Sequence, residues 1–132
     1  MSEEAVDVVR RAIDAYNRRD FEAIRALNHA DVEVDWSASR GLVAGIYRGA
    51  DEVIAFMRDF LETFEYVRMD ADRYVESGEL VVVPNTTHIR GRDGIETVAR
   101  SALFFELRDG RVARIRLYQE TTEALEAAGL AE

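Results

Sequence analysis

The spacing of apolar residues changes at Tyr66, and this change constrains the fold more than any other feature of the sequence. Before it, apolar residues such as Val9 and Ile13 recur every three or four positions, which predicts amphipathic helices. After it, apolar and polar residues alternate, and Asp109-Gly110 is a strong signal for a tight hairpin. The sequence therefore predicts an α+β fold in which helices cover one face of a sheet built from hairpins.

Helices are predicted over about residues 3–16, 20–27, 51–64 and 122–129. Strands are predicted over about residues 32–36, 66–75, 79–90, 95–107 and 111–119. Residues 37–48 show no sustained period, so we expect a loop or flap there. We expect residues 1–132 to form a single domain, a cone-shaped, curved antiparallel or mixed sheet wrapped around the first three helices.

Composition excludes several kinds of chemistry. The chain has no cysteine and all 17 of its basic residues are arginine, which excludes disulfides, thiolate sites and Schiff-base lysines. The net charge of −9 argues against nucleic-acid and membrane partners. The acidic start is unlike a signal peptide and no apolar run reaches about 20 residues, so we expect a cytoplasmic protein. The two histidines lie far apart without a ligand motif, so we expect no metal and no cofactor.

Three segments resemble the nuclear transport factor 2-like superfamily, and within it the SnoaL-like group. They read AIDAYNRRDFEAIRALNHADVEVDW, YRGADEVIAFMRDFLETF and FFELRDGRVARIRLYQETTEALEAAGL. The resemblance covers nearly the whole chain and implies the cone fold. Because the superfamily includes ketosteroid isomerase-like enzymes, polyketide cyclases, epoxide hydrolases and proteins with no known reaction, the resemblance does not imply one activity.

Alternation along the strands predicts which side chains face the interior, once the resemblance sets the inward face and a bulge is assumed near Ala113-Arg114. The result is a mostly apolar cavity with a few neutral hydrogen-bonding groups, which is typical of a small-molecule site. A closed core, in which buried polar groups bond only to neighbouring backbone, is the alternative. The predicted pocket residues are Tyr16, Trp36, Met57, Phe60, Asn85, Thr87, Ser101 and Gln119.

Acid–base catalysis in such a cavity needs a carboxylate whose pKa is raised by an apolar environment. The ketosteroid isomerase-like pattern would place that base, a second acid and a tyrosine where this sequence has Trp36, Leu103 and Ala12. The epoxide hydrolase-like pattern of an arginine two residues before an aspartate is also absent, because Arg100 is followed by Ser101 and Ala102. Because the residues that the ketosteroid isomerase-like pattern requires are missing, we expect that the chain is not a steroid isomerase.

Asp35 is the remaining candidate catalytic residue, in the manner of the single aspartate base of the cyclases. Its alternation with Val34 turns it outward, however, which favours a solvated surface acid. His88 is a candidate proton shuttle, but its position in the alternation predicts the outer face of the sheet and favours a structural role at an interface. His29 is expected to end the second helix and to interact with its dipole.

The outer face combines arginines with aromatic residues and is predicted to pair two copies of the chain, sheet against sheet. A solvated face with local Arg–Glu pairs is the alternative, each pair contributing about 0–1 kcal/mol. The predicted homodimer contacts are His88, Arg90, Arg100, Phe104, Arg116 and Tyr118.

Three hypotheses of function follow. The first is a protein that binds a small apolar organic molecule and acts on it as an isomerase, cyclase or hydrolase. The second is a non-catalytic binding or accessory protein with the same cavity, which the missing inward carboxylates favour. The third, an adaptor between proteins, predicts no cavity.

Overall fold

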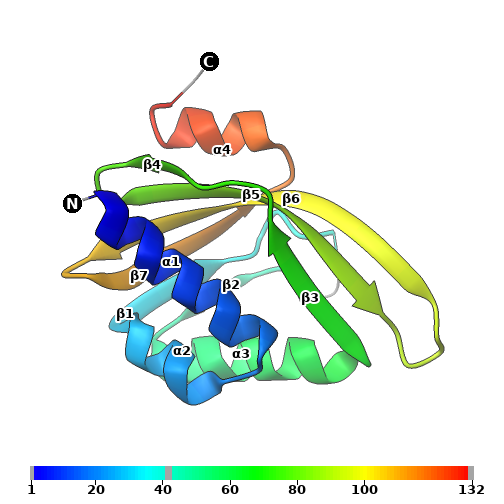
Figure 1. Ribbon diagram of the computed structural model, residues 1–132. Coiled ribbons are helices and arrows are strands. Elements are labelled where there is room, and N and C mark those ends of the chain that lie inside the picture. The colour runs from blue at the N-terminus through cyan, green and yellow to red at the C-terminus, as the bar shows by residue number, and fades with distance from the viewer. Residues whose placement is uncertain (1, 41–42, 131–132) are drawn as a thin grey trace.

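The computed structural model describes residues 2–40 and 43–130 (Figure 1). Its helices are α1 (Ser2–Asn17), α2 (Phe21–Leu27), α3 (Ala50–Thr63) and α4 (Thr121–Ala127). Its strands are β1 (Asn28–Asp35), β2 (Ile46–Arg48), β3 (Tyr66–Ala71), β4 (Val75–Ser77), β5 (Leu80–Arg90), β6 (Glu96–Arg108) and β7 (Arg111–Tyr118). The predicted α+β fold, with a curved sheet and a short C-terminal helix, is confirmed.

The strands form one mixed sheet in the order β2-β1-β7-β6-β5-β3, with β4 paired to β5. The β1–β7 pair is parallel and the other pairs are antiparallel. Between β6 and β7 the register skips Ala113, because Glu106 lies opposite Arg114 whereas Leu107 lies opposite Val112. This irregularity confirms the predicted bulge, which leaves both Val112 and Ile115 buried.

Helices α1, α2 and α3 cover one face of the sheet and α4 lies on the other (Figure 1), and each face carries its own apolar cluster. The larger one joins the inward side chains of β5, β6 and β7 to α1, α2 and α3. The smaller one packs Ala124 and Leu125 of α4 against Val82, Ala102 and Phe104 on the outer face. The C-terminal helix therefore covers part of the face on which dimer contacts were predicted, and Phe104 is buried beneath it.

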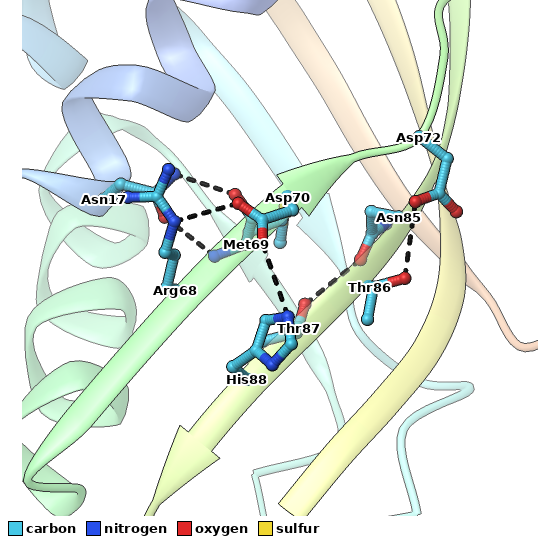
Figure 2. Close-up of polar contacts among 9 residues, drawn as sticks. All are labelled: Asn17, Arg68, Met69, Asp70, Asp72, Asn85, Thr86, Thr87 and His88. Carbon is cyan, nitrogen blue, oxygen red and sulfur yellow. Dashed lines mark hydrogen bonds and ion pairs between the residues drawn. The ribbon is translucent and has the colours of Figure 1, made fainter.

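Side-chain hydrogen bonds fix the start of α2 and the end of α1. Asp20 begins α2 by accepting a hydrogen bond from the Ala23 N–H at 3.1 Å. Asn17, at the end of α1, donates to the Met69 carbonyl and accepts from the Met69 N–H, both at 2.8 Å (Figure 2). This pair of bonds anchors the end of α1 on β3.

Several boundaries differ from the prediction. The short strand β2 lies within residues 37–48, of which 41 and 42 are outside the described part, and the predicted strand 66–75 divides into β3 and β4. Strand β1 begins directly after α2, so His29 lies in the strand rather than at a helix end. Its Nδ1 accepts a hydrogen bond from the Asp31 N–H at 3.1 Å. None of the described helices has the length and hydropathy needed to cross a bilayer.

Candidate functional site

A cavity lies between the concave face of the sheet and helices α1, α2 and α3. Its lining residues are Ala12, Ile13, Tyr16, Ile24, Asn28, Val34, Trp36, Phe56, Met57, Phe60, Met69, Leu103, Phe105 and Ile115. The space open to the centre of a water molecule is about 50 Å³. That corresponds to roughly four waters, or about 120 Å³ of liquid volume, which is room for one six-membered ring.

Aromatic side chains form one wall of this cavity. Phe56 of α3 meets Trp36 edge to face with ring centroids 5.7 Å apart, and Phe60 lies 6.4 Å from Phe56. Tyr47 of β2 stacks on Phe56 at 4.1 Å, and its hydroxyl donates to the Val43 carbonyl at 2.6 Å. The unpredicted strand β2 thus supports the aromatic wall from outside the cavity. Such walls favour a flat or ring-shaped apolar guest.

Three lining residues carry hydrogen-bonding groups: Tyr16 from α1, Asn28 from the start of β1, and Trp36 through its indole N–H. Burial raises the pKa of the Tyr16 hydroxyl well above its ordinary value, and nearby Arg19 offsets this only in part, so the hydroxyl is neutral at pH 7. Asn28 is 4% exposed. Its buried Nδ2 has no hydrogen-bond partner in residues 2–40 and 43–130, whereas its backbone N–H is bonded to α2 carbonyls.

The structure divides the eight predicted pocket residues into two groups. Tyr16, Trp36, Met57 and Phe60 line the cavity. The other four lie outside its lining: Asn85, Thr87, Ser101 and Gln119. Gln119 instead donates through Nε2 to the Ala38 carbonyl at 2.9 Å, which ties the end of β7 to the segment after β1.

On the β5–β6 pair, hydrogen bonds connect Asn85 to Thr87 and Ser101. Asn85 is 1% exposed and donates through Nδ2 to the Val83 carbonyl at 3.1 Å. Its Oδ1 accepts from Thr87 Oγ1 at 3.1 Å, as Figure 2 shows, and from Ser101 Oγ at 3.5 Å. Thr87 lies opposite Met69, which lines the cavity, but neither Thr87 nor its partners Asn85 and Ser101 belong to the lining.

Asp35 does not line the cavity and is not the solvated acid that its alternation suggested. Its residue is 7% exposed, and Oδ1 accepts hydrogen bonds from the Ser37 hydroxyl at 2.6 Å and the Ser37 N–H at 3.0 Å. Oδ2 lies 3.5 Å from Arg116 Nε. Desolvation alone would raise the pKa of Asp35, but these bonds and the charges of Arg116 and Arg114 outweigh it and lower the pKa. The environment holds Asp35 as an ion-paired anion.

On the outer face, His88 pairs with Asp70 of the neighbouring strand rather than with the cavity. Its Nε2 lies 3.3 Å from Asp70 Oδ2, and Arg68 Nε lies 2.9 Å from Oδ1 of the same carboxylate (Figure 2). All three side chains are about half exposed. The predicted outward direction of His88 is therefore correct.

The chemistry that the lining offers is chiefly apolar contact, and its hydrogen-bonding groups, on Tyr16, Asn28 and Trp36, are neutral. No carboxylate or imidazole belongs to it, and the described residues contain no cluster of three or more potential metal ligands. Asn28 and Phe56 are lining residues that sequence reasoning missed. The signal for Asn28 was a polar residue directly between a helix and a strand, which is ordinarily interpreted only as a helix cap.

A family model described as a SnoaL-like domain matches residues 9–115. Among curated proteins, none matches the chain. A solved structure of an NTF2-like protein of unknown function from Burkholderia pseudomallei is 27% identical, with a TM-score of 0.80 over 96% of this chain and 97% of the other.

Two more distant structures show the same fold. A Mycobacterium tuberculosis protein in complex with estradiol-17beta-hemisuccinate is 15% identical, with a TM-score of 0.79 over 91% of this chain and 95% of its own. An LEH-like epoxide hydrolase from M. tuberculosis is 18% identical, with a TM-score of 0.73 over 95% and 89% of the two chains. At 15% and 18% sequence identity, these two structures show a likeness in fold alone.

Proposed function

The chain belongs to the SnoaL-like family of the nuclear transport factor 2-like superfamily, and from that premise we propose that it binds a small, uncharged, ring-shaped organic molecule. The binding place is the cavity between the sheet and α1, α2 and α3. The observation that carries the proposal is its lining, apolar and aromatic except for Tyr16 and Asn28. Sites for small organic molecules have this make-up, a mostly apolar hollow with a few polar groups that orient the guest.

Size and charge narrow the ligand. Space for roughly four waters suits one ring, or the ring end of a longer molecule, rather than a multi-ring compound held whole. The lining has no charged residue, so a charged guest would lose its hydration without gaining a counter-ion. The complex of one structural neighbour with a steroid ester supports the idea that this fold accommodates apolar rings.

Binding without acid–base catalysis agrees best with the lining. A proton-transfer enzyme needs a base within hydrogen-bond reach of its substrate and with a pKa near the working pH. Asp35 has its oxygens committed to Ser37 and Arg116, and its pKa is lowered, which makes it a weak base. His88 is on the opposite face of the sheet, paired with Asp70. We therefore place the chain among non-catalytic binding proteins.

Trp36 provides the test, because it is the only tryptophan of the chain and lines the cavity. Titration with ring-sized compounds such as cyclohexanone should shift its fluorescence in a saturable manner. Ala12→Leu adds volume to the lining and is expected to weaken binding at least tenfold. The matched control is Ala55→Leu, the same change at an exposed position of α3, and it should leave binding unchanged. Equal binding by both variants, or no saturable shift in the wild type, would contradict the proposal.

A further inference from the structure

One edge of the sheet is open along part of β6. Strand β5 pairs with β6 from residue 96 onward, but β7 pairs with it only from Ala102 onward. Residues 96–101 therefore form the border of the sheet, at the right of Figure 1, and no second strand of the described chain pairs with them. Residues 92–100 are all exposed, among them Ile95 at 65% and Val98 at 59%. An exposed strand edge is a template for pairing with another strand.

The other edges of the sheet are protected. At β3, the Asn17 side chain is bonded to both the N–H and the carbonyl of Met69 and so occupies that edge. The remaining edge strands, β2 and β4, have three residues each. Covered edges and very short edge strands are common ways in which proteins prevent pairing between copies. Within the described residues, the open part of β6 has neither protection.

The direction of the backbone groups on this edge follows from the hairpin. The Gly91 N–H donates to the Ile95 carbonyl at 2.9 Å, so the carbonyl of Ile95 faces β5. Because these directions alternate along an antiparallel strand, the N–H and C=O groups of Glu96, Val98 and Arg100 face the open edge. The side chains of these three residues share one face of the sheet.

The open edge is self-complementary in charge about Val98. Glu96 and Arg100 carry opposite charges, and each is two residues from Val98. If two copies pair antiparallel around a two-fold axis at Val98, Glu96 of each copy lies opposite Arg100 of the other, and these residues exchange backbone hydrogen bonds. Sliding the strands by two residues puts one of the charges opposite Val98. Sliding them by four puts two glutamates or two arginines face to face, which is destabilising.

The charged groups are available for such contacts. None of the described residues forms an ion pair with Arg100, whose neighbour on β5 is Thr86. Glu96 is bonded to Arg90 of its own chain through Oε2, which lies 3.0 Å from Nη2. In the pair, Glu96 would lie between Arg90 and the partner's Arg100. Opposite charges directly across two strands stabilise the pairing.

We propose that two copies of this chain pair through this edge, β6 antiparallel to β6 around Val98, and join their sheets into one. The occupant is a second copy because the edge matches itself both in charge and in the direction of its backbone groups. This arrangement differs from packing of the outer faces, part of which is covered by α4. It is independent of the proposed function, since none of residues 95–101 lines the cavity.

Charge reversal tests the register, with dimer dissociation constants measured by sedimentation equilibrium of the full chain. Glu96→Arg alone, or Arg100→Glu alone, puts like charges opposite each other at both symmetric positions. Each variant is expected to weaken the dimer by about tenfold or more. An equimolar mixture of the two variants restores opposite charges at both positions and should dimerise as the wild type does. The matched control is Arg108→Glu, at an exposed residue of β6 that pairs with β7, and it should leave the dimer unchanged.

Cross-linking tests the same geometry directly, because the chain has no cysteine of its own. Opposite residues of a hydrogen-bonded antiparallel pair have Cα atoms about 5.5 Å apart, which is within reach of a disulfide. Val98→Cys should therefore give a covalent dimer under mild oxidation. Ile95→Cys, at a more exposed position that would face the partner's Ser101, should not.

Three results would overturn the inference. They are a monomeric wild type, single charge variants that dimerise as tightly as the wild type, and equal cross-linking by the two cysteine variants. A wild-type dimer that is insensitive to both charge reversals would indicate that the copies pair elsewhere, for example through their outer faces. None of these results bears on binding in the cavity, so the proposed function stands or fails separately.

Discussion

The two buried asparagines predict opposite effects on stability when each is replaced by leucine. In Asn28→Leu an unpaired buried Nδ2 is replaced by apolar atoms beside an unfilled cavity. Leaving a buried donor unsatisfied costs about 1–3 kcal/mol, so its removal should raise the free energy of unfolding by about 1–2 kcal/mol. For a chain of 132 residues, 1 kcal/mol shifts the melting temperature by roughly 3 °C, so a rise of about 3–6 °C is expected.

In Asn85→Leu the same substitution removes a side chain that makes three hydrogen bonds. The Val83 carbonyl loses its side-chain partner, while the partly exposed Thr87 and Ser101 hydroxyls can turn to water. The expected loss is about 1–3 kcal/mol, a fall of roughly 3–9 °C. Urea unfolding and calorimetry of the ligand-free proteins measure both values. Equal destabilisation by the two substitutions would refute the reasoning, because it would mean that Asn28 has a partner that stabilises the fold.

Three other predictions concern groups outside this comparison. Asp35→Asn should lower the free energy of unfolding by about 1–3 kcal/mol at pH 7. Because the folded-state pKa of Asp35 is lowered, this stabilisation is present above about pH 4 and is lost as the pH falls through the folded-state pKa. The urea midpoints of the wild type and the variant should therefore converge in acid. Burial raises the pKa of Tyr16, so the wild type should lose stability above about pH 10, where the unfolded state releases this proton, and Tyr16→Phe should show a smaller loss in the same alkaline titration. The homodimer remains a prediction. Sedimentation equilibrium should give a dimer for the wild type and a monomer for Val98→Asp, because this change places a charge on a side chain of β6 that is 59% exposed. A monomeric wild type would contradict the predicted homodimer.

Periodicity predicted the elements because each of them is defined by its own neighbours in sequence. The helical spacing before Tyr66 and the Asp109-Gly110 turn needed no distant information, and Asp109 and Gly110 adopt the positive φ values of 54° and 76° that such a turn requires. Even the bulge at Ala113 followed from the need to bury residues on both sides of it. The three-residue strand β2 was not predicted, because it is defined only by its pairing with β1.

The candidate site was only half predictable, since alternation gives the face of a strand but not the depth along it. Asn85 faces inward as expected, yet it is bonded to Thr87 and Ser101 and does not line the cavity. Asp35 was expected in water, but Arg116, which neutralises it, lies 81 positions later in the chain. Such partners are set by the parallel β1–β7 pairing, which no local pattern specifies.

The central claim is that the space lined by Trp36 receives a ring-sized guest, and methionine methyl groups test it most directly. Met57 and Met69 both line the cavity. In protein labelled with carbon-13 at its methionine methyls, saturating cyclohexanone should shift both signals and give nuclear Overhauser effects to the ligand's ring protons. Binding seen by fluorescence without such contacts at Met57 and Met69, or no change in either signal at saturation, would contradict the account.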